Sequence, residues 1–121
     1  MGAAAFDAER LDDYIQVIAV EGELDLSSSS ELRRLVEGSL REGRNCVVLD
    51  LSEVTHMDST GLASLIAAHQ LTAERRGRLA LVITSESVRR TVEVRGLDRL
   101  FTIAPTREEG LAAVRDPRDQ R

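Results

Sequence analysis

The stretch Asp58-Ser59-Thr60-Gly61 places an acid, two hydroxyls and a glycine between an apolar run and a long apolar helical pattern. The first N–H groups of a helix have no partner within the helix, and the helix dipole favours negative charge there. Two roles suit these residue types at this place. Asp58 or Ser59 could cap the helix through a side-chain oxygen, or the helix start could receive a phosphate group.

The spacing of these residues does not fit a known catalytic arrangement. The nucleophile elbow of hydrolases needs a glycine two places before the serine, where this chain has Met57. His56 lies in the same short segment as Ser59, and no second element orients it as a base. Asp50-Leu51-Ser52 lacks the second aspartate of an aspartyl phosphatase. We therefore expect no enzyme activity, and Ser59 remains as a serine that could be modified.

Composition narrows the function classes further. The 121 residues suit one domain, and the 42% of hydrophobic residues predict a folded chain. The net charge of −5 argues against nucleic-acid binding, which needs a basic face. No apolar run approaches the roughly 18 residues that span a membrane. Two histidines and one cysteine, far apart, predict no metal site or other cofactor. The single Cys46 and the absence of a signal-peptide pattern indicate the cytoplasm.

Several elements are needed to position Ser59. Residues 14–20 are rich in β-formers and predict a strand that ends near a bend at Gly22. Residues 27–30 are polar and predict a hinge, followed by a helix to about Glu42. Ser28 and Glu31 have the spacing of a capping box for that helix. Residues 46–51 are almost continuously apolar, as in a strand covered on both faces of a parallel sheet.

The pattern continues to alternate after Ser59. The further predicted elements are a helix at about 60–76, a strand at 79–83, a helix from Ser85 or Ser87 to Gly96, a strand at 102–104 and a helix from Thr106 to Val114. Residues 4–6 predict a short edge strand. Repeated strand–helix–strand units indicate a single α/β domain over residues 1–121, with a mixed, mostly parallel sheet of four to five strands and about four helices. We expect the ordered core at about 4–115 and frayed residues at 116–121.

Four segments together resemble one known family, the STAS domain, and within it the stand-alone anti-sigma factor antagonists. The segments that carry the resemblance are Gly22-Glu23-Leu24-Asp25, Val48-Leu49-Asp50-Leu51-Ser52, Met57-Asp58-Ser59-Thr60-Gly61-Leu62, and Val94-Arg95-Gly96-Leu97 with Leu100-Phe101. The resemblance covers roughly Tyr14 to Val114. It implies a STAS-like fold for the whole chain.

The resemblance also implies a phosphorylation switch. In this family the serine at the place of Ser59 is phosphorylated by the anti-sigma factor, which is a serine kinase. The unphosphorylated antagonist binds that kinase and frees the sigma factor, and a serine phosphatase resets the switch. Asp58 and Asp25 match acids of the family, and Thr60 stands where it could be an alternative acceptor. Gly61 and Leu62 complete the motif and are expected near the partner surface.

Other interpretations of the same residues stay open. Asp25 could only cap a helix, Gly61 could only permit close packing, and Leu62 could belong to the core. A STAS domain could also serve as a subunit of a transport assembly or of a stress-sensing assembly.

Phosphorylation adds a charge of about −1.5 to −2, which a helix start tolerates, so we expect it to block an interface without refolding the domain. We expect a monomer or a weak homodimer, without nucleic acid or membrane insertion.

Overall fold

The computed structural model describes residues 4–115, so the predicted fraying of residues 116–121 lies outside the described part. The strands are β1 (Ala5–Arg10), β2 (Ile15–Leu24), β3 (Cys46–Met57), β4 (Arg78–Val82) and β5 (Thr102–Ala104). The helices are α1 (Leu26–Arg41), α2 (Ser59–Glu74), α3 (Glu86–Val94) and α4 (Arg107–Val114), with a 3₁₀ turn at Leu97–Arg99. The alternation of strands and helices predicted from the sequence is confirmed.

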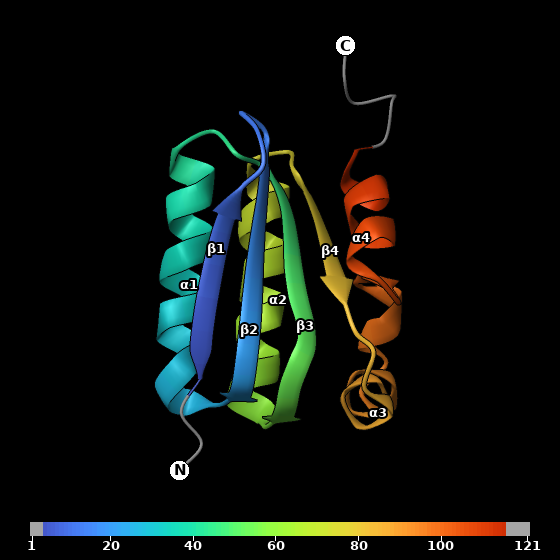
Figure 1. The fold of residues 1–121 in the computed structure, drawn as a ribbon. Coiled ribbons are helices and arrows are strands. Elements are labelled where there is room, and N and C mark those ends of the chain that lie inside the picture. The colour runs from blue at the N-terminus through green and yellow to red at the C-terminus, as the bar shows by residue number, and fades with distance from the viewer. Residues whose placement is uncertain (1–3, 116–121) are drawn as a thin grey trace.

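The five strands form one sheet in the order in which they occur along the chain (Figure 1). β1 runs antiparallel to β2, and the pairs β2–β3, β3–β4 and β4–β5 are parallel. Helices α1 and α2 lie side by side on one face of the sheet, and α4 covers part of the other face. The mixed, mostly parallel sheet with four α-helices agrees with the predicted fold class.

Aliphatic side chains build the core on both faces of the sheet. The larger cluster lies against α1, α2 and α3 and includes Ile18, Leu24, Leu32, Val36, Leu49, Leu65, Leu81 and Val92. The smaller cluster lies against α4 and consists of Val17, Val48, Ala80, Val82 and Val114. Because β3 contributes Val47 and Leu49 to one cluster and Val48 to the other, its apolar run is continuous, as a strand covered on both faces requires.

Three strands are longer than the sequence pattern predicted. The edge strand expected at residues 4–6 is β1, which runs over Ala5–Arg10. β2 continues past Val20 to Leu24, and the expected bend at Gly22 appears as a positive φ of 97° beside shifts in the pairing register. β3 continues past Leu51 to Met57. In that extension Val54 and Met57 are buried and the residues between them are not, so the continuous apolar signal is lost although the pairing with β2 goes on.

The predicted hinge at residues 27–30 is wrong, because these serines form the first turns of α1. The helix begins at Leu26, and Asp25 is its N-cap. The capping box pairs Asp25 with Ser28, where the sequence suggested Ser28 with Glu31: the Asp25 carboxylate accepts the Ser28 N–H, and the Ser28 hydroxyl accepts the Asp25 N–H at 2.9 Å. Serine is a poor helix former, yet the apolar stripe of α1 packs on the sheet and outweighs that preference.

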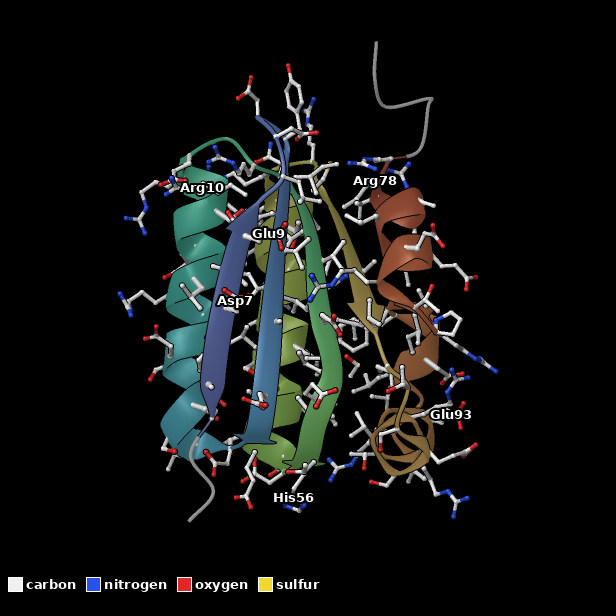
Figure 2. The ribbon with its side chains drawn as sticks, in the orientation of Figure 1. Asp7, Glu9, Arg10, His56, Arg78 and Glu93 are labelled. Carbon is white, nitrogen blue, oxygen red and sulfur yellow. The ribbon has the colours of Figure 1, made fainter. Side chains whose placement is uncertain are left out.

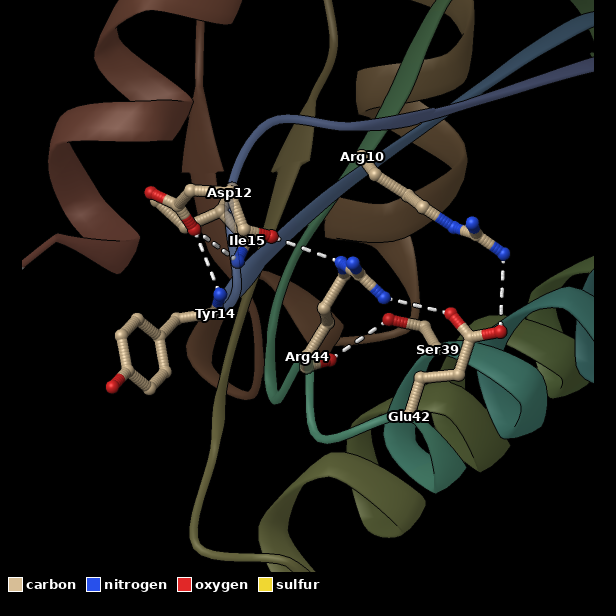
Figure 3. Close-up of polar contacts among 7 residues, drawn as sticks. All are labelled: Arg10, Asp12, Tyr14, Ile15, Ser39, Glu42 and Arg44. Atoms are coloured by element: carbon tan, nitrogen blue, oxygen red, sulfur yellow. Dashed lines mark hydrogen bonds and ion pairs between the residues drawn. The ribbon is translucent and has the colours of Figure 1, made fainter.

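A polar network closes the end of the sheet where β2 and β3 begin (Figure 3). The Arg44 guanidinium donates to the Asp12 carbonyl at 2.9 Å and pairs with the Glu42 carboxylate at 2.7 Å. Glu42 also pairs with Arg10 of β1 at 3.1 Å. These contacts join the β1–β2 turn to the loop after α1. The start of β2 is therefore fixed independently of the opposite end, where the phosphoacceptor candidate lies.

At that opposite end β2 and β3 stop in register, with Leu24 paired to Met57. Each strand is followed at once by an aspartate and a helix. Gly61, in the first turn of α2, lies against the last carbonyl of β2: a Cβ atom at position 61 would come 2.1 Å from the Leu24 oxygen. Real Cβ atoms do not approach an oxygen so closely, so α2 can begin at this place only with glycine at position 61.

We expect Gly61→Ala to lower the free energy of unfolding by at least 1–3 kcal/mol, because the added methyl group must push α2 away from β2. Gly38→Ala is the matched control, since Gly38 lies within α1 and has nothing within 4 Å of its Cβ position. There alanine should stabilise the helix by up to about 1 kcal/mol. Urea denaturation followed by circular dichroism measures both effects, and equal stability of the two variants would contradict the close contact.

Candidate functional site

The candidate site lies at the edge of the sheet where β2 and β3 end. The carboxyl ends of neighbouring parallel strands are also where open α/β sheets bind their ligands. Asp25 and Asp58 follow the paired residues Leu24 and Met57, so the two acids stand next to each other as N-caps of α1 and α2. The structure thus brings Asp25 close to the segment of Asp58, Ser59, Thr60 and Gly61.

Asp58 occupies the anion position at the start of α2. Its carboxylate accepts the Gly61 N–H at 2.9 Å and the Thr60 hydroxyl at 2.6 Å. The hydrogen bond from the Thr60 hydroxyl, followed by the one from the Gly61 N–H, lowers the pKa of Asp58 below its ordinary value. A phosphate would therefore meet a carboxylate already bound to the helix start. Of the two roles that the sequence left open for this start, the structure shows the cap, and Asp58 is the residue that makes it.

Ser59 is the exposed first residue of α2, and its side chain forms no hydrogen bond with any residue in the described range 4–115. It is therefore not a cap, although the sequence left that role open. Ser59 is exposed, and Asp58 makes its cap bonds to Thr60 and Gly61 without the Ser59 side chain. His56, at the same edge in Figure 2, is exposed and makes no hydrogen bond to Ser59. The pair consequently lacks the geometry of a nucleophile with its base.

Asp25 repeats the arrangement at the start of α1. Its carboxylate accepts the Ser27 hydroxyl at 2.8 Å and the Ser27 N–H at 3.1 Å. The side-chain hydrogen bond from Ser27 is the largest cause that lowers the pKa of Asp25. The capping role that the sequence offered as an alternative for Asp25 is thus real. It leaves the carboxylate exposed enough to face a partner as well.

One hydroxyl ties the two helix starts together. The Ser29 hydroxyl of α1 has one proton, which it shares between the Asp25 carbonyl at 2.6 Å and the Thr60 carbonyl at 3.2 Å. The latter bond crosses from one helix to the other. The two capped turns therefore form a single connected surface. Sequence reasoning missed Ser29, because nothing in the run of four serines marks which one faces the neighbouring helix.

Leu62 is placed differently from the expected partner surface. Only 3% of its surface is exposed, and it belongs to the large core cluster. The exposed apolar residue at this edge is instead Leu26, with 74% of its surface open to solvent. Leu62 thus takes the core role that the sequence offered as its alternative.

Asp50, the acid of the phosphatase-like stretch, lies away from this edge and serves the fold. Its carboxylate pairs with Arg107 of α4 at 2.9 Å and accepts the Ser52 hydroxyl at 2.6 Å. Burial raises the pKa of Asp50, but the hydrogen bonds from Ser52 and the Arg107 guanidinium outweigh burial and leave the pKa lowered. Asp50 therefore holds the start of α4 on the sheet.

Two matched variants test the helix caps through the pKa values of the capping carboxyl groups, Asp58 and Asp25. A lowered pKa in the folded state means that ionised Asp58 stabilises the fold above its ordinary pKa, and that this contribution is lost as the pH falls through the folded pKa. Thr60→Val removes the largest cause, so the pKa of Asp58 should rise toward its ordinary value. The stabilisation by ionised Asp58 should then be smaller, and its loss should be complete at a higher pH. Carboxyl-carbon NMR titration measures this shift.

Ser27→Ala is the control for that titration, because it should raise the pKa of Asp25 and leave the pKa of Asp58 unchanged. The reciprocal result is expected for Thr60→Val. If either variant moved both carboxyls equally, the two caps would not be separate hydrogen-bonded units.

Comparisons with known proteins place this geometry in a family. A family profile described as the STAS domain matches residues 5–110. The chain is 34% identical over 98 residues to the anti-sigma-B factor antagonist of Listeria monocytogenes, covering 78% of this chain and 82% of that protein. The crystal structure of an anti-sigma factor antagonist from Mycobacterium paratuberculosis superposes with a TM-score of 0.85 at 29% identity, covering 95% and 97% of the two chains.

A second solved structure shows the same fold in a modified state. The Bacillus cell fate determinant SpoIIAA in its phosphorylated form superposes with a TM-score of 0.72 at 25% identity, covering 92% of this chain and 100% of that one. The profile covers most of the chain, and the two structures superpose on 95% and 92% of it. The chain therefore belongs to the STAS domain family.

Proposed function

We propose that this protein is an anti-sigma factor antagonist whose activity is switched by phosphorylation of Ser59. In this proposal the unphosphorylated form binds an anti-sigma factor that is a serine kinase, and the sigma factor is released. Phosphorylation ends that binding, and a serine phosphatase restores it. The observation that carries the proposal is the free, exposed hydroxyl of Ser59 at the first position of α2, beside the Asp58 cap.

The known roles of similar proteins support this proposal. The Listeria protein and the Mycobacterium structure are anti-sigma factor antagonists, and SpoIIAA exists in a phosphorylated form. The chain covers most of the length of each. The lack of a hydrogen bond between Ser59 and His56 favours a binding module over an enzyme. We further propose that it acts in the cytoplasm without a cofactor; no helix within residues 4–115 is long and apolar enough to cross a membrane.

The hydrogen bonds favour Ser59 over Thr60 as the acceptor. The Thr60 hydroxyl donates its proton to the Asp58 carboxylate at 2.6 Å, so phosphorylation there would break that bond and set a phosphate against the carboxylate. The Ser59 hydroxyl has no such bond to lose. Thr60 is therefore assigned to the cap, and Ser59 to the phosphoryl transfer.

The close contact that phosphoryl transfer requires also explains why the phosphorylated chain no longer binds the kinase. For reaction, the Ser59 oxygen must come within about 3–3.5 Å of the γ-phosphorus of ATP held by the kinase. Once phosphorylated, Ser59 would bring its own dianion to the place of the nucleotide phosphates, next to Asp58. A repulsion of about 2.8 kcal/mol already lowers the affinity a hundredfold. The cap bonds of α2 do not involve the Ser59 side chain, so the fold itself is unaffected.

A phosphorylation assay tests the proposal. The purified chain is mixed with ATP, magnesium and each serine-kinase anti-sigma factor of its source cell, and trypsin peptides are analysed by mass spectrometry. Trypsin should release residues 45–75 as one peptide, and we expect the phosphate on Ser59 within it. Ser59→Ala should abolish that phosphate and still bind the kinase, whereas Ser59→Asp should weaken binding.

Thr60→Val is the matched control and should still be phosphorylated on Ser59. Phosphate that persists in the 45–75 peptide of Ser59→Ala would move the acceptor to another hydroxyl. If no kinase of the cell modifies or binds the chain, the antagonist role is wrong, and a subunit role in a transport or stress-sensing assembly takes its place.

A further inference from the structure

Leu26 is exposed in a way that the fold does not require. It is the first residue of α1, with 74% of its surface open to solvent, and it belongs to neither core cluster. A large aliphatic side chain gains nothing at this position from helix capping, since Asp25 supplies the cap. Its burial against another molecule would remove a substantial apolar surface from water.

Leu26 and Ser59 occupy equivalent positions on neighbouring helices. Leu24 and Met57 are paired across β2 and β3, and the chain advances two residues from each to reach the first residue of the next helix. Both helices rest on the same face of the sheet, and the Ser29 hydroxyl ties their first turns together at 3.2 Å. An exposed leucine and the exposed phosphoacceptor candidate therefore begin two helices that pack against each other at the same edge of the sheet.

A shallow groove between α1 and α2 extends this apolar surface from Leu26. Its walls include Ala63 and Ala67 of α2, whose small side chains leave the groove open, and Thr60 near its start. Arg33 of α1 also lines it and is held by Glu37 at 3.3 Å. The groove thus offers an apolar floor that leads away from the turn of Ser59.

Carboxylates surround the exposed end of this surface. Asp25 and Asp58 cap the two helices, and Glu23, the residue before Leu24, is paired with His56 across the strands. A complementary partner would consequently present an apolar side chain to Leu26, flanked by basic groups that meet the acids.

We propose that Leu26 and the adjoining α1–α2 groove form the anchor that positions Ser59 on its kinase, and that the kinase supplies an apolar side chain ringed by basic ones. This inference rests on the proposed function, since it assigns the recognition element of the same phosphoryl transfer. Leu26 takes no part in the chemistry. It determines how tightly and in which orientation the kinase holds the turn that bears Ser59.

The test compares two exposed aliphatic residues. Leu26→Ala should raise the KM for phosphorylation of Ser59, and the Kd for the kinase with ADP, roughly tenfold or more, because a central apolar anchor is lost. The kcat at saturating chain concentration should change less than about twofold, since the acceptor turn is intact. Val94→Ala is the control: Val94 is 77% exposed on α3, outside the groove, and its loss should change neither constant.

Three results would overturn the anchor. Unchanged KM and Kd in Leu26→Ala, with Ser59 still phosphorylated, would refute it and leave the antagonist role intact. An equal rise in Val94→Ala would show a general surface effect instead of an anchor. A wild-type chain that no kinase binds or modifies would refute both the antagonist role and the anchor. Urea denaturation of Leu26→Ala should match wild type, because the side chain contributes nothing to the core.

Discussion

The contact between Gly61 and the Leu24 carbonyl determines where everything else at the site lies. It is a contact of backbone with backbone, so no side chain can relax to accommodate a change. The Asp58 N–H points to the same Leu24 oxygen at 3.4 Å, so the whole turn between β3 and α2 is set against the end of β2. With α2 fixed there, Asp58 must be its cap and Ser59 must stand outside the cap. The backbone contacts at Gly61 and Asp58 thus determine where the acceptor candidate lies.

Electrostatics at this edge distinguishes a switch from an anion-binding site. A helix start that binds free phosphate leaves its N–H groups open, as in phosphate-binding loops. Here the Asp58 carboxylate fills that position, and Asp25 does the same on α1. Charge added covalently to Ser59 therefore gains little from the helix and changes mainly what an approaching molecule encounters. This explains how a modification can alter binding without altering the fold that carries it.

The sequence predicted strands and helices correctly wherever a residue pattern allowed only one physical interpretation. The continuous apolar runs of β3 and β4 and the end of α3 just before Gly96 fall in this group. The 27–30 segment failed because serine favours caps and turns locally, whereas the packing of Leu32, Val36 and Leu40 on the sheet decides the outcome. The second half of β3 was not predicted, because only Val54 and Met57 are buried there. The pairing with β2 therefore leaves no continuous apolar pattern in the sequence.

The candidate site was predictable in part for the same reason. Asp58, Ser59 and Gly61 lie in one short segment whose local chemistry indicates a capped helix start, and the structure places them so. The relation of Leu26 to Ser59 is not local: it arises only because Leu24 pairs with Met57 and both helices begin two residues later. Leu62 shows the opposite case. Its position in the Asp-Ser-Thr-Gly-Leu motif suggested that it lies on the partner surface, but it lies on the face of α2 that packs into the core. The residues proposed to recognise a partner are therefore brought together by the register between two strands. A change of one residue in that register would separate Leu26 from Ser59 and leave both sequence motifs intact.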